Sequence, residues 1–367
     1  MMQFIFFAVS VILLLGGHVL TWIIWRNLFA LNQAGSVISG LIFLFLFLSI
    51  VISSYLIHKK DRTLIRVYYF FSGIWTGFLV NFILIATVVY LFKFLFPTFF
   101  VNNLLLSNVV FFSSLGLSIF GIFKAFATKV KYYEVRIKDL PEYWWDKEIV
   151  QISDIHLGPV YRKNFLQKTI KRINQLEPEL VCITGDLFDG MESDFTWLNN
   201  PFSQLKTKQG IYYSLGNHDF YLGFNRVKQL LSKTPLIILD NKMKVISGLQ
   251  IIGINYSFKK DFNLYQAILD QVGYNSKQAS LLLYHEPRNI NLAIQAGIDL
   301  QLSGHTHRGQ LFPFNYLAKI AYKGYDAGFF KKGDFNLIVN SGLGTWGPPM
   351  RTSGRGEISL IKLKPLK

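Results

Sequence analysis

The pattern of apolar and polar positions divides the chain into two parts near residue 123. Residues 1–123 contain four long stretches that, apart from His18, have no acidic or basic side chain: Phe4–Trp25, Val37–Ile57, Val67–Phe92 and Leu104–Phe123. Each has about the 20 residues that a helix needs to cross about 30 Å of hydrocarbon. Four such stretches in succession are not typical of the buried helices of a soluble protein. We therefore expect a transmembrane domain of four helices over residues 1–125.

The rest of the chain alternates short apolar runs with turn residues and charges. The runs Glu148–Ser153 and Leu180–Thr184 flank Arg162–Leu176, which has the spacing of a helix with basic residues outward. This order predicts a βαβ unit with a parallel pair of strands. Further strands are expected at Val130–Lys138, Ile211–Leu215, Ser280–Tyr284 and Asp299–Leu302, and two more in Leu337–Lys364 around the glycine-rich loop Gly342–Gly356. We expect a juxtamembrane connector over 126–144 and an α/β domain over 145–367.

Basic residues predict how the chain is oriented in the membrane. The loop after the second stretch contains Lys59, Lys60, Arg62 and Arg66, and the segment after the fourth contains Lys124, Lys129, Lys131, Arg136 and Lys138. The loops after the first and third stretches carry only Arg26 and Lys93. Lysine and arginine are enriched on the cytoplasmic side of membrane proteins, so the C-terminal domain is expected to be cytoplasmic, at the inner or plasma membrane.

The formal net charge of +16 raises the question of a nucleic-acid partner. The sequence contains no nucleic-acid motif, and much of the positive charge lies beside the membrane stretches, so attraction to anionic lipid head groups is the simpler interpretation. The single cysteine, Cys182, lies in an apolar run and is expected to be a small core residue. One thiol excludes an internal disulfide.

Carboxylates and histidines gather in five motifs of the second part. They are Ser153-Asp154-Ile155-His156, Gly185-Asp186-Leu187-Phe188-Asp189, Gly216-Asn217-His218-Asp219, Tyr284-His285-Glu286 and Gly304-His305-Thr306-His307. Each motif begins where a predicted strand ends, and the carboxyl ends of strands form the edge of an α/β sheet on which ligand sites are built. Imidazole, carboxylate and amide oxygen suit borderline divalent metals. The motifs supply enough donors for two ions, with positions left for water and substrate.

Each of these residues also has a plainer interpretation. A single aspartate at a strand exit is usually a turn or cap residue, and Asn217 after glycine is common turn chemistry. His285 alone would more often be a buried, hydrogen-bonded histidine than a ligand. The five motifs together, and in this order, favour the bimetallic site. His18 and His58 belong to no cluster, and neither is given a catalytic role.

The order of the motifs resembles that of the calcineurin-like metallophosphoesterases. The family pattern D-x-H, G-D-x-x-D, G-N-H-[DE], a lone H and G-H-x-H is matched within roughly residues 145–364. The runs at 303–310 and 342–351 are similar to the membrane-attached branch, which includes transmembrane metallophosphoesterase-domain proteins and a bacterial enzyme cleaving UDP-2,3-diacylglucosamine. The resemblance implies an α/β domain with a β-sandwich core flanked by helices.

The resemblance also implies roles for individual residues. One metal ion would be held by Asp154, His156, Asp186 and His307, and the other by Asp186, Asn217, His285 and His305, so that Asp186 bridges the two. His218 would stabilise charge on the phosphoryl group, with Asp189 orienting it. Mn²⁺ is expected, and Fe²⁺ and Zn²⁺ are alternatives. Two ions about 3.5–4 Å apart would support in-line attack by a bridging hydroxide.

One departure from the family concerns the arginine that would bind the substrate phosphate. Asp189 is followed directly by Gly190, where the phosphatase branch often has an arginine. Arg308 or Arg351 could supply the missing guanidinium, which suits a pair of phosphate oxygens.

The leading hypothesis is a membrane-anchored hydrolase of a phosphoester or pyrophosphate, with a lipid-linked substrate such as UDP-2,3-diacylglucosamine in lipid A synthesis. The segments Phe312–Lys332 and Phe262–Val272 would then approach acyl chains. A phospholipid phosphodiesterase or a broad-specificity phosphatase is the alternative. A membrane sensor or transporter with a non-catalytic binding domain is a hypothesis of another class, but the spans carry no charge pair to mark a pathway. The oligomeric state stays open.

Overall fold

The computed structural model describes residues 2–97, 103–256 and 262–366. The chain forms two compact units, 1–123 with 347–350 and 124–346 with 351–367. The division therefore falls between Phe123 and Lys124. The segment 126–144, expected to be a connector, contains a strand of the second unit.

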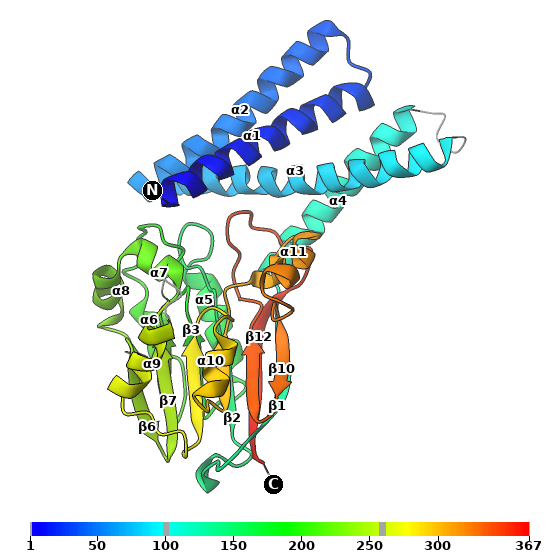
Figure 1. Ribbon diagram of the computed structural model, residues 1–367. Helices are drawn as coiled ribbons and strands as arrows, with labels where there is room; N and C mark the ends of the chain where they lie inside the picture. Colours follow the sequence, from blue (N-terminus) through cyan, green and yellow to red (C-terminus); the bar gives the residue numbers. More distant parts are fainter. Residues whose placement is uncertain (1, 98–102, 257–261, 367) are drawn as a thin grey trace. The chain divides into compact units, whose positions relative to one another are not determined.

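The first unit is helical, as predicted. Its described helices are α1 (Met2–Leu28), α2 (Gln33–Lys59), α3 (Thr63–Leu95) and α4 (Asn103–Phe126), the last of which ends in the second unit (Figure 1). Among the described residues, these four are long and apolar enough to cross a membrane. Phe78, Phe82 and Val110 pack together in the core of the unit. His18 is buried, and its Nε2 accepts a hydrogen bond from the Trp75 indole at 2.9 Å. This histidine has a structural partner and belongs to no described metal cluster.

The described part of the second unit contains two six-stranded mixed sheets (Figure 1). The first has the order β1 (Thr128–Ile137), β12 (Gly356–Pro365), β2 (Glu148–Ile152), β3 (Leu180–Thr184), β4 (Ile211–Ser214), β5 (Leu236–Ile238). The second has the order β10 (Gly328–Lys332), β11 (Phe335–Val339), β9 (Leu300–Ser303), β8 (Ser280–Tyr284), β7 (Leu249–Ile254), β6 (Lys242–Ile246). The sandwich flanked by helices is the expected α/β architecture.

The central strands of both sheets, such as β3, β4, β8 and β9, are buried on both faces, and their sequences are therefore continuous apolar runs. In β3, Leu180 and Cys182 belong to the core between the two sheets, whereas Val181 and Ile183 belong to the outer core of the first sheet. That outer core also contains side chains of α5 (Lys163–Asn174), α6 (Asn199–Ser203) and α8 (Phe224–Leu231). The outer core of the second sheet contains side chains of α9 (Phe262–Gln271) and α10 (Ile290–Gln295).

The strands that carry the motifs run parallel within each sheet. β2, β3 and β4 are parallel neighbours, and so are β8 and β9. The βαβ unit predicted around Arg162–Leu176 is therefore confirmed, with α5 as its helix. The sequence pattern did not identify β5, β6, β7 or β10, of which all except β7 lie at sheet edges.

One expectation about acyl-chain contact is wrong. The segment Phe262–Val272 was expected to face lipid, but α9 buries Tyr265, Ile268 and Leu269 against the second sheet. Its apolar face is therefore part of the protein core.

The buried position of Cys182 gives a first testable prediction. Burial raises the pKa of its thiol well above the usual range, so the reactive thiolate is scarce and enclosed. We expect no reaction with a chromogenic thiol reagent in the native protein, and reaction of one thiol per chain after denaturation. Fast reaction of the native protein would contradict the described packing between the sheets.

Candidate metal centre

The loops that leave β2, β3, β4, β8 and β9 bring the predicted donors together, although these strands belong to two different sheets. Three groups have potential ligand atoms within 4.8 Å of one another. They are Asp154, His156 and His307; His156, Asp189 and His218; and Asp186, His285 and His305.

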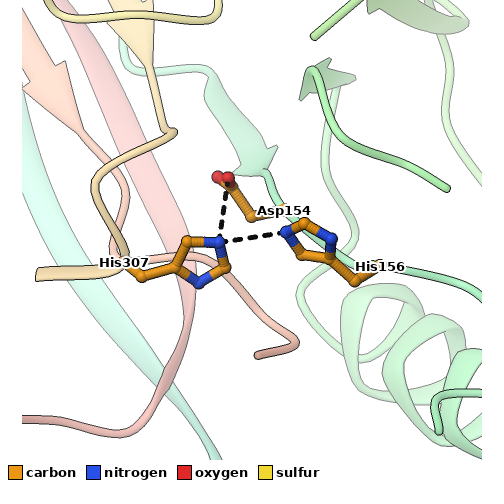
Figure 2. A group of neighbouring side chains, drawn as sticks. All are labelled: Asp154, His156 and His307. Atoms are coloured by element: carbon orange, nitrogen blue, oxygen red, sulfur yellow. Dashed lines mark hydrogen bonds and ion pairs between the residues drawn. The ribbon is translucent and has the colours of Figure 1, made fainter. Parts of the chain in front are cut away.

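The first group faces one point from three directions (Figure 2). His307 Nε2 lies 3.0 Å from His156 Nε2 and 3.4 Å from Asp154 Oδ1. All three side chains are buried. Two imidazole nitrogens and a carboxylate oxygen that converge in this way form a suitable set of ligands for a divalent ion.

The group of Asp186, His285 and His305 is arranged similarly. His285 Nε2 lies 3.1 Å from Asp186 Oδ2 and 3.1 Å from His305 Nδ1. The same carboxylate oxygen of Asp186 lies 4.0 Å from His156 Nε2 of the first group. Asp186 therefore lies between the two sets of donors.

Asn217 provides an independent test of whether the residues fit a metal. Its side chain is buried, and its Oδ1 has no hydrogen-bond partner among the described residues. Leaving a buried acceptor unsatisfied costs about 1–3 kcal/mol. Asn217 stands between Gly216 and His218, and the main-chain N–H of His218 donates to Asp186 Oδ1 at 2.8 Å. A divalent ion beside Asp186 would satisfy this oxygen, so the donor set fits a metal.

Hydrogen bonds on the far side of two rings orient the predicted ligands. His285 Nδ1 contacts the carbonyl of Thr184 at 2.7 Å, and His156 Nδ1 contacts Asp189 Oδ1 at 3.1 Å. In each case the other ring nitrogen, Nε2, points to the cluster. Partners of this kind fix the tautomer and the orientation of metal-binding histidines.

Asp189 contacts two histidines through different atoms. Its carboxylate contacts His156, whereas its backbone carbonyl lies 2.9 Å from Nδ1 of His218. The physical reason is that Asp189 is the fifth residue after β3 and lies against the loop after β2, where its main-chain N–H donates to the carbonyl of Leu157. The main-chain carbonyl of Asp189 is thus the group that contacts His218.

Burial sets the charge of the histidines in the last motif. Burial, and then the nearby His285, lower the pKa of His305 to about 3, and burial lowers the pKa of His307 well below the usual value. Both rings are therefore neutral near pH 7, as a metal ligand must be. Burial alone would raise the pKa of Asp186, but His285 and His218 hold it well below its usual value, so this carboxylate is ionised.

The backbone of the predicted ligands has an uncommon conformation. Asp154, His156, Asp186, His305 and His307 have φ values of 50°, 52°, 50°, 71° and 47°. This left-handed region is unfavourable for residues other than glycine, and such strain costs about 1–3 kcal/mol for each residue. Five strained residues gathered at one cluster indicate that the fold imposes their directions for function.

Glycines let the loops approach one another closely. A Cβ atom on Gly304 would overlap Ser153 Oγ and Asp154 Oδ2, and one on Gly216 would overlap Asp186 Oδ1. Any side chain at either position would push a predicted metal ligand out of place.

Two residues that sequence reasoning left without a role support the site. The carboxylate of Asp219 accepts from the main-chain N–H groups of Gly216 at 2.8 Å, Asp186 at 2.9 Å and Phe188 at 3.2 Å. It thus holds the β3 and β4 exit loops together. Burial, and then the charge of Asp186, raise its pKa to about 7. The acidic position that ends the third motif was the signal for this residue.

Glu286 is the second residue of this kind. Its Oε1 lies 3.7 Å from Nε2 of His305, whose Nδ1 faces the cluster. The same carboxylate pairs with the half-buried Arg288. Its position directly after His285 in the fourth motif was the only sequence signal.

The two candidate phosphate-binding arginines have different surroundings. Arg351 is fully buried, and its Nη2 donates to the carbonyls of Ser341 at 2.9 Å and Gly342 at 3.2 Å. It also lies 3.2 Å from Nδ1 of His307, so it supports the last loop. Arg308 is exposed and directly follows His307.

The tight approach at Gly304 predicts the effect of adding one methyl group. Gly304→Ala should displace the Asp154 carboxylate and weaken divalent-ion binding by about 10–100-fold, as for loss of a group that orients a ligand. Metal content and ion affinity can be measured by atomic absorption and calorimetry. Gly354→Ala is the matched control, because its Cβ would lie 3.8 Å from Arg308 Cδ, an ordinary contact. Equal affinities in the two variants would contradict the described approach.

Comparison with known proteins agrees with this geometry. Residues 147–309 match the family described as calcineurin-like phosphoesterase. The chain is 37% identical over 261 residues to an uncharacterized metallophosphoesterase of Campylobacter jejuni, covering 70% of each chain. It is 34% identical over 238 residues to one of Helicobacter pylori, covering 63% of this chain and 64% of that one. It is 31% identical over 273 residues to a Danio rerio transmembrane protein with metallophosphoesterase domain, covering 68% and 60%.

The chain thus spans less than two thirds of the length of the latter two relatives. The family is metal-dependent and acts on phosphorylated substrates, and the relative named as a transmembrane protein agrees with the four apolar helices. This chain belongs to the calcineurin-like metallophosphoesterases, in their membrane-attached branch.

Proposed function

We propose that this protein is a membrane-anchored hydrolase of phosphoesters or pyrophosphates that uses two divalent ions. The observation that carries the proposal is the position of Asp186 between two groups of donors. Residues 1–125 would anchor the chain, and 145–367 would hold the hydrolase domain, to which β1 of the connector 126–144 adds a strand.

The ligand assignment follows the two groups. Asp154, His156 and His307 would hold one ion, His285, His305 and Asn217 the other, and Asp186 would contribute to both. Mn²⁺ is the ion we expect, with Fe²⁺ and Zn²⁺ as alternatives that accept the same ligands. Such a pair of ions would lower the pKa of a water molecule and neutralise phosphate charge.

The remaining residues would bind and orient the substrate. The carbonyl of Asp189 accepts the Nδ1 proton of His218, so this ring can present Nε2 to the phosphoryl group or the leaving oxygen. Arg308 is the better candidate for binding phosphate, because it is exposed beside His307, whereas the Nη2 donors of Arg351 are bound to carbonyls. Asp219 would position the loops after β3 and β4, and Glu286 would position the ring of His305.

A lipid-linked phosphate is the substrate class we propose. The support is the hydrolase unit's direct connection to a candidate membrane span, and the membrane-attached relatives. UDP-2,3-diacylglucosamine is the most concrete substrate, and a phospholipid diester or a simple phosphoester is the alternative. Assay of the purified chain with Mn²⁺ against these three classes would decide among them.

Replacing the shared carboxylate tests the proposal directly. Asp186→Asn should abolish both metal loading and hydrolysis, because the neutral amide removes the negative charge between the two groups. Metal content and turnover of an aryl phosphodiester would be measured on the same preparation. Unchanged turnover would refute the role of Asp186.

His218→Gln is the companion variant, because it keeps the main-chain N–H that donates to Asp186. It should keep the metal content of the parent and lower kcat by about 10²–10³-fold, as expected for loss of a donor to the transition state. Loss of metal from this variant would instead make His218 a ligand.

The cytoplasmic orientation is a separate proposal with its own test. Protease added to intact cells should spare residues 145–364, and the same protease should cut them after the membrane is opened by detergent. The basic residues beside the second and fourth spans are the reason for this expectation. Digestion of the domain in intact cells would reverse the topology.

A further inference from the structure

The helix α11 (Phe314–Ala321) carries an apolar surface that the fold of the second unit does not use. None of its eight side chains is buried. Leu317 is 60% exposed and Ile320 75% exposed. The neighbouring Phe312, Phe314 and Tyr316 are also exposed, so the helix adds little to the described core. Helices of globular proteins normally bury an apolar stripe, which makes this exposure informative. We call these five residues the α11 surface.

The α11 surface is connected to the metal centre. The short helix η3 (His307–Gly309) contains the predicted ligand His307 and precedes α11 by four residues. Gln310, next in the chain, exchanges hydrogen bonds with the main chain of Trp346 at 3.0 and 2.9 Å. Trp346 is 52% exposed, and its ring lies 6.3 Å from that of His218. An exposed aromatic side chain of this kind is typical of a membrane–water interface.

Cations accompany the apolar side chains. Lys319 lies on α11 and Lys323 follows it, and both are exposed. A second group of cations lies around Arg308: Lys124, Lys129 and Arg355 are close enough to interact electrostatically with one another or with it. We call Arg308, Lys124, Lys129 and Arg355 the basic cluster. Like charges gathered in this way repel one another, and an anionic partner would relieve the repulsion.

The basic cluster lies at the end of a candidate membrane span. The candidate span that ends at Phe126 includes Lys124, and both residues belong to the second unit. The Phe126 ring packs against Tyr161, whose hydroxyl donates to the carbonyl of Ala125. The end of the span is thus fixed within the hydrolase unit. If this span crosses a membrane, its end would bring the basic cluster to the lipid head groups.

We propose that the α11 surface and the basic cluster together bind the surface of an anionic lipid bilayer. The apolar side chains of α11 would enter the boundary between head groups and acyl chains, about 5–10 Å deep, while the lysines and arginines contact lipid phosphates. A second copy of the chain is a poorer partner, because the same cations would face one another across such a contact. This inference depends on the membrane anchor but not on the proposed hydrolysis.

A fluorescent label on α11 would test the inference in the full-length protein. Because Cys182 is buried, Ile320→Cys provides an accessible thiol for an environment-sensitive dye. The labelled chain would be reconstituted in vesicles of phosphatidylcholine, with or without phosphatidylglycerol, containing lipids brominated on the acyl chains. We expect a blue shift and quenching that increase with phosphatidylglycerol. Val245→Cys is the matched control, since Val245 is exposed on β6, at the sheet edge opposite β10.

A charge variant tests the second half of the inference. Adding Lys129→Glu and Arg355→Glu to the labelled chain should lower the ratio of bound to unbound domain about fivefold for each lost cation, seen as reduced quenching. Neither residue belongs to the metal centre, so metal content should be unchanged. Quenching no stronger at 320 than at 245 would overturn the inference. So would quenching that is independent of phosphatidylglycerol, or a label that reports contact between copies of the chain in detergent.

Discussion

The site depends on a single buried carboxylate shared between two sheets. Asp186 lies in the loop after β3 of the first sheet, yet its Oδ2 faces His285, which lies in the loop after β8 of the second sheet. Its Oδ1 accepts the main-chain N–H of His218 from the loop after β4. Because one ionised group contacts three loops, its position fixes theirs. A buried carboxylate is stable only where opposing charge and donors surround it, which here means imidazoles, main-chain N–H groups and the ions that the site fits.

The fold gives this carboxylate a precise environment through strain and close packing. Asp186 and four predicted ligands have left-handed backbones, a conformation that local sequence preference disfavours. The free energy for this comes from the three cores on the two sheets, where strands are buried on both faces. Asp219 accepts three main-chain hydrogen bonds, which join the loops after β3 and after β4 to the start of α7 (Asn217–Leu222). The core thus supplies rigidity, and the loops supply the directions of the ligands.

The sequence was sufficient for features that depend on composition and local pattern. The four apolar helices, the parallel β2–β3 pair and the family could be predicted because length, periodicity and motif order are local properties. The pairing of the motif strands in two separate sheets could not, since pattern alone does not say which strands are neighbours. For the same reason α9 was expected to meet lipid, although a sheet covers its apolar face.

Within the site, the sequence could not show which atoms of each residue make the contacts. Asp189 has a carboxylate and a carbonyl, and only the path of the loop decides that the first contacts His156 and the second His218. Arg351 and Arg308 are chemically equivalent in the sequence, yet one is enclosed by carbonyls and the other is exposed. Two side chains of the same type therefore differ in role: the buried Arg351 supports a loop, and the exposed Arg308 is a candidate for binding substrate. Roles carried over from a family motif are therefore best assigned to atoms rather than to residues.

The helices α11 and α9 have a similar apolar character but differ in whether the protein covers their apolar side chains. α9 packs on the second sheet and contributes to its outer core, so its apolar side chains stabilise the fold. α11 follows the loop that contains His305 and His307, and none of its side chains is buried among the described residues. An apolar surface that does not stabilise the fold raises the free energy of the protein when it is exposed to water. α11 directly follows the predicted ligands. The membrane that anchors the chain is therefore the simplest environment in which its apolar side chains would no longer be exposed to water.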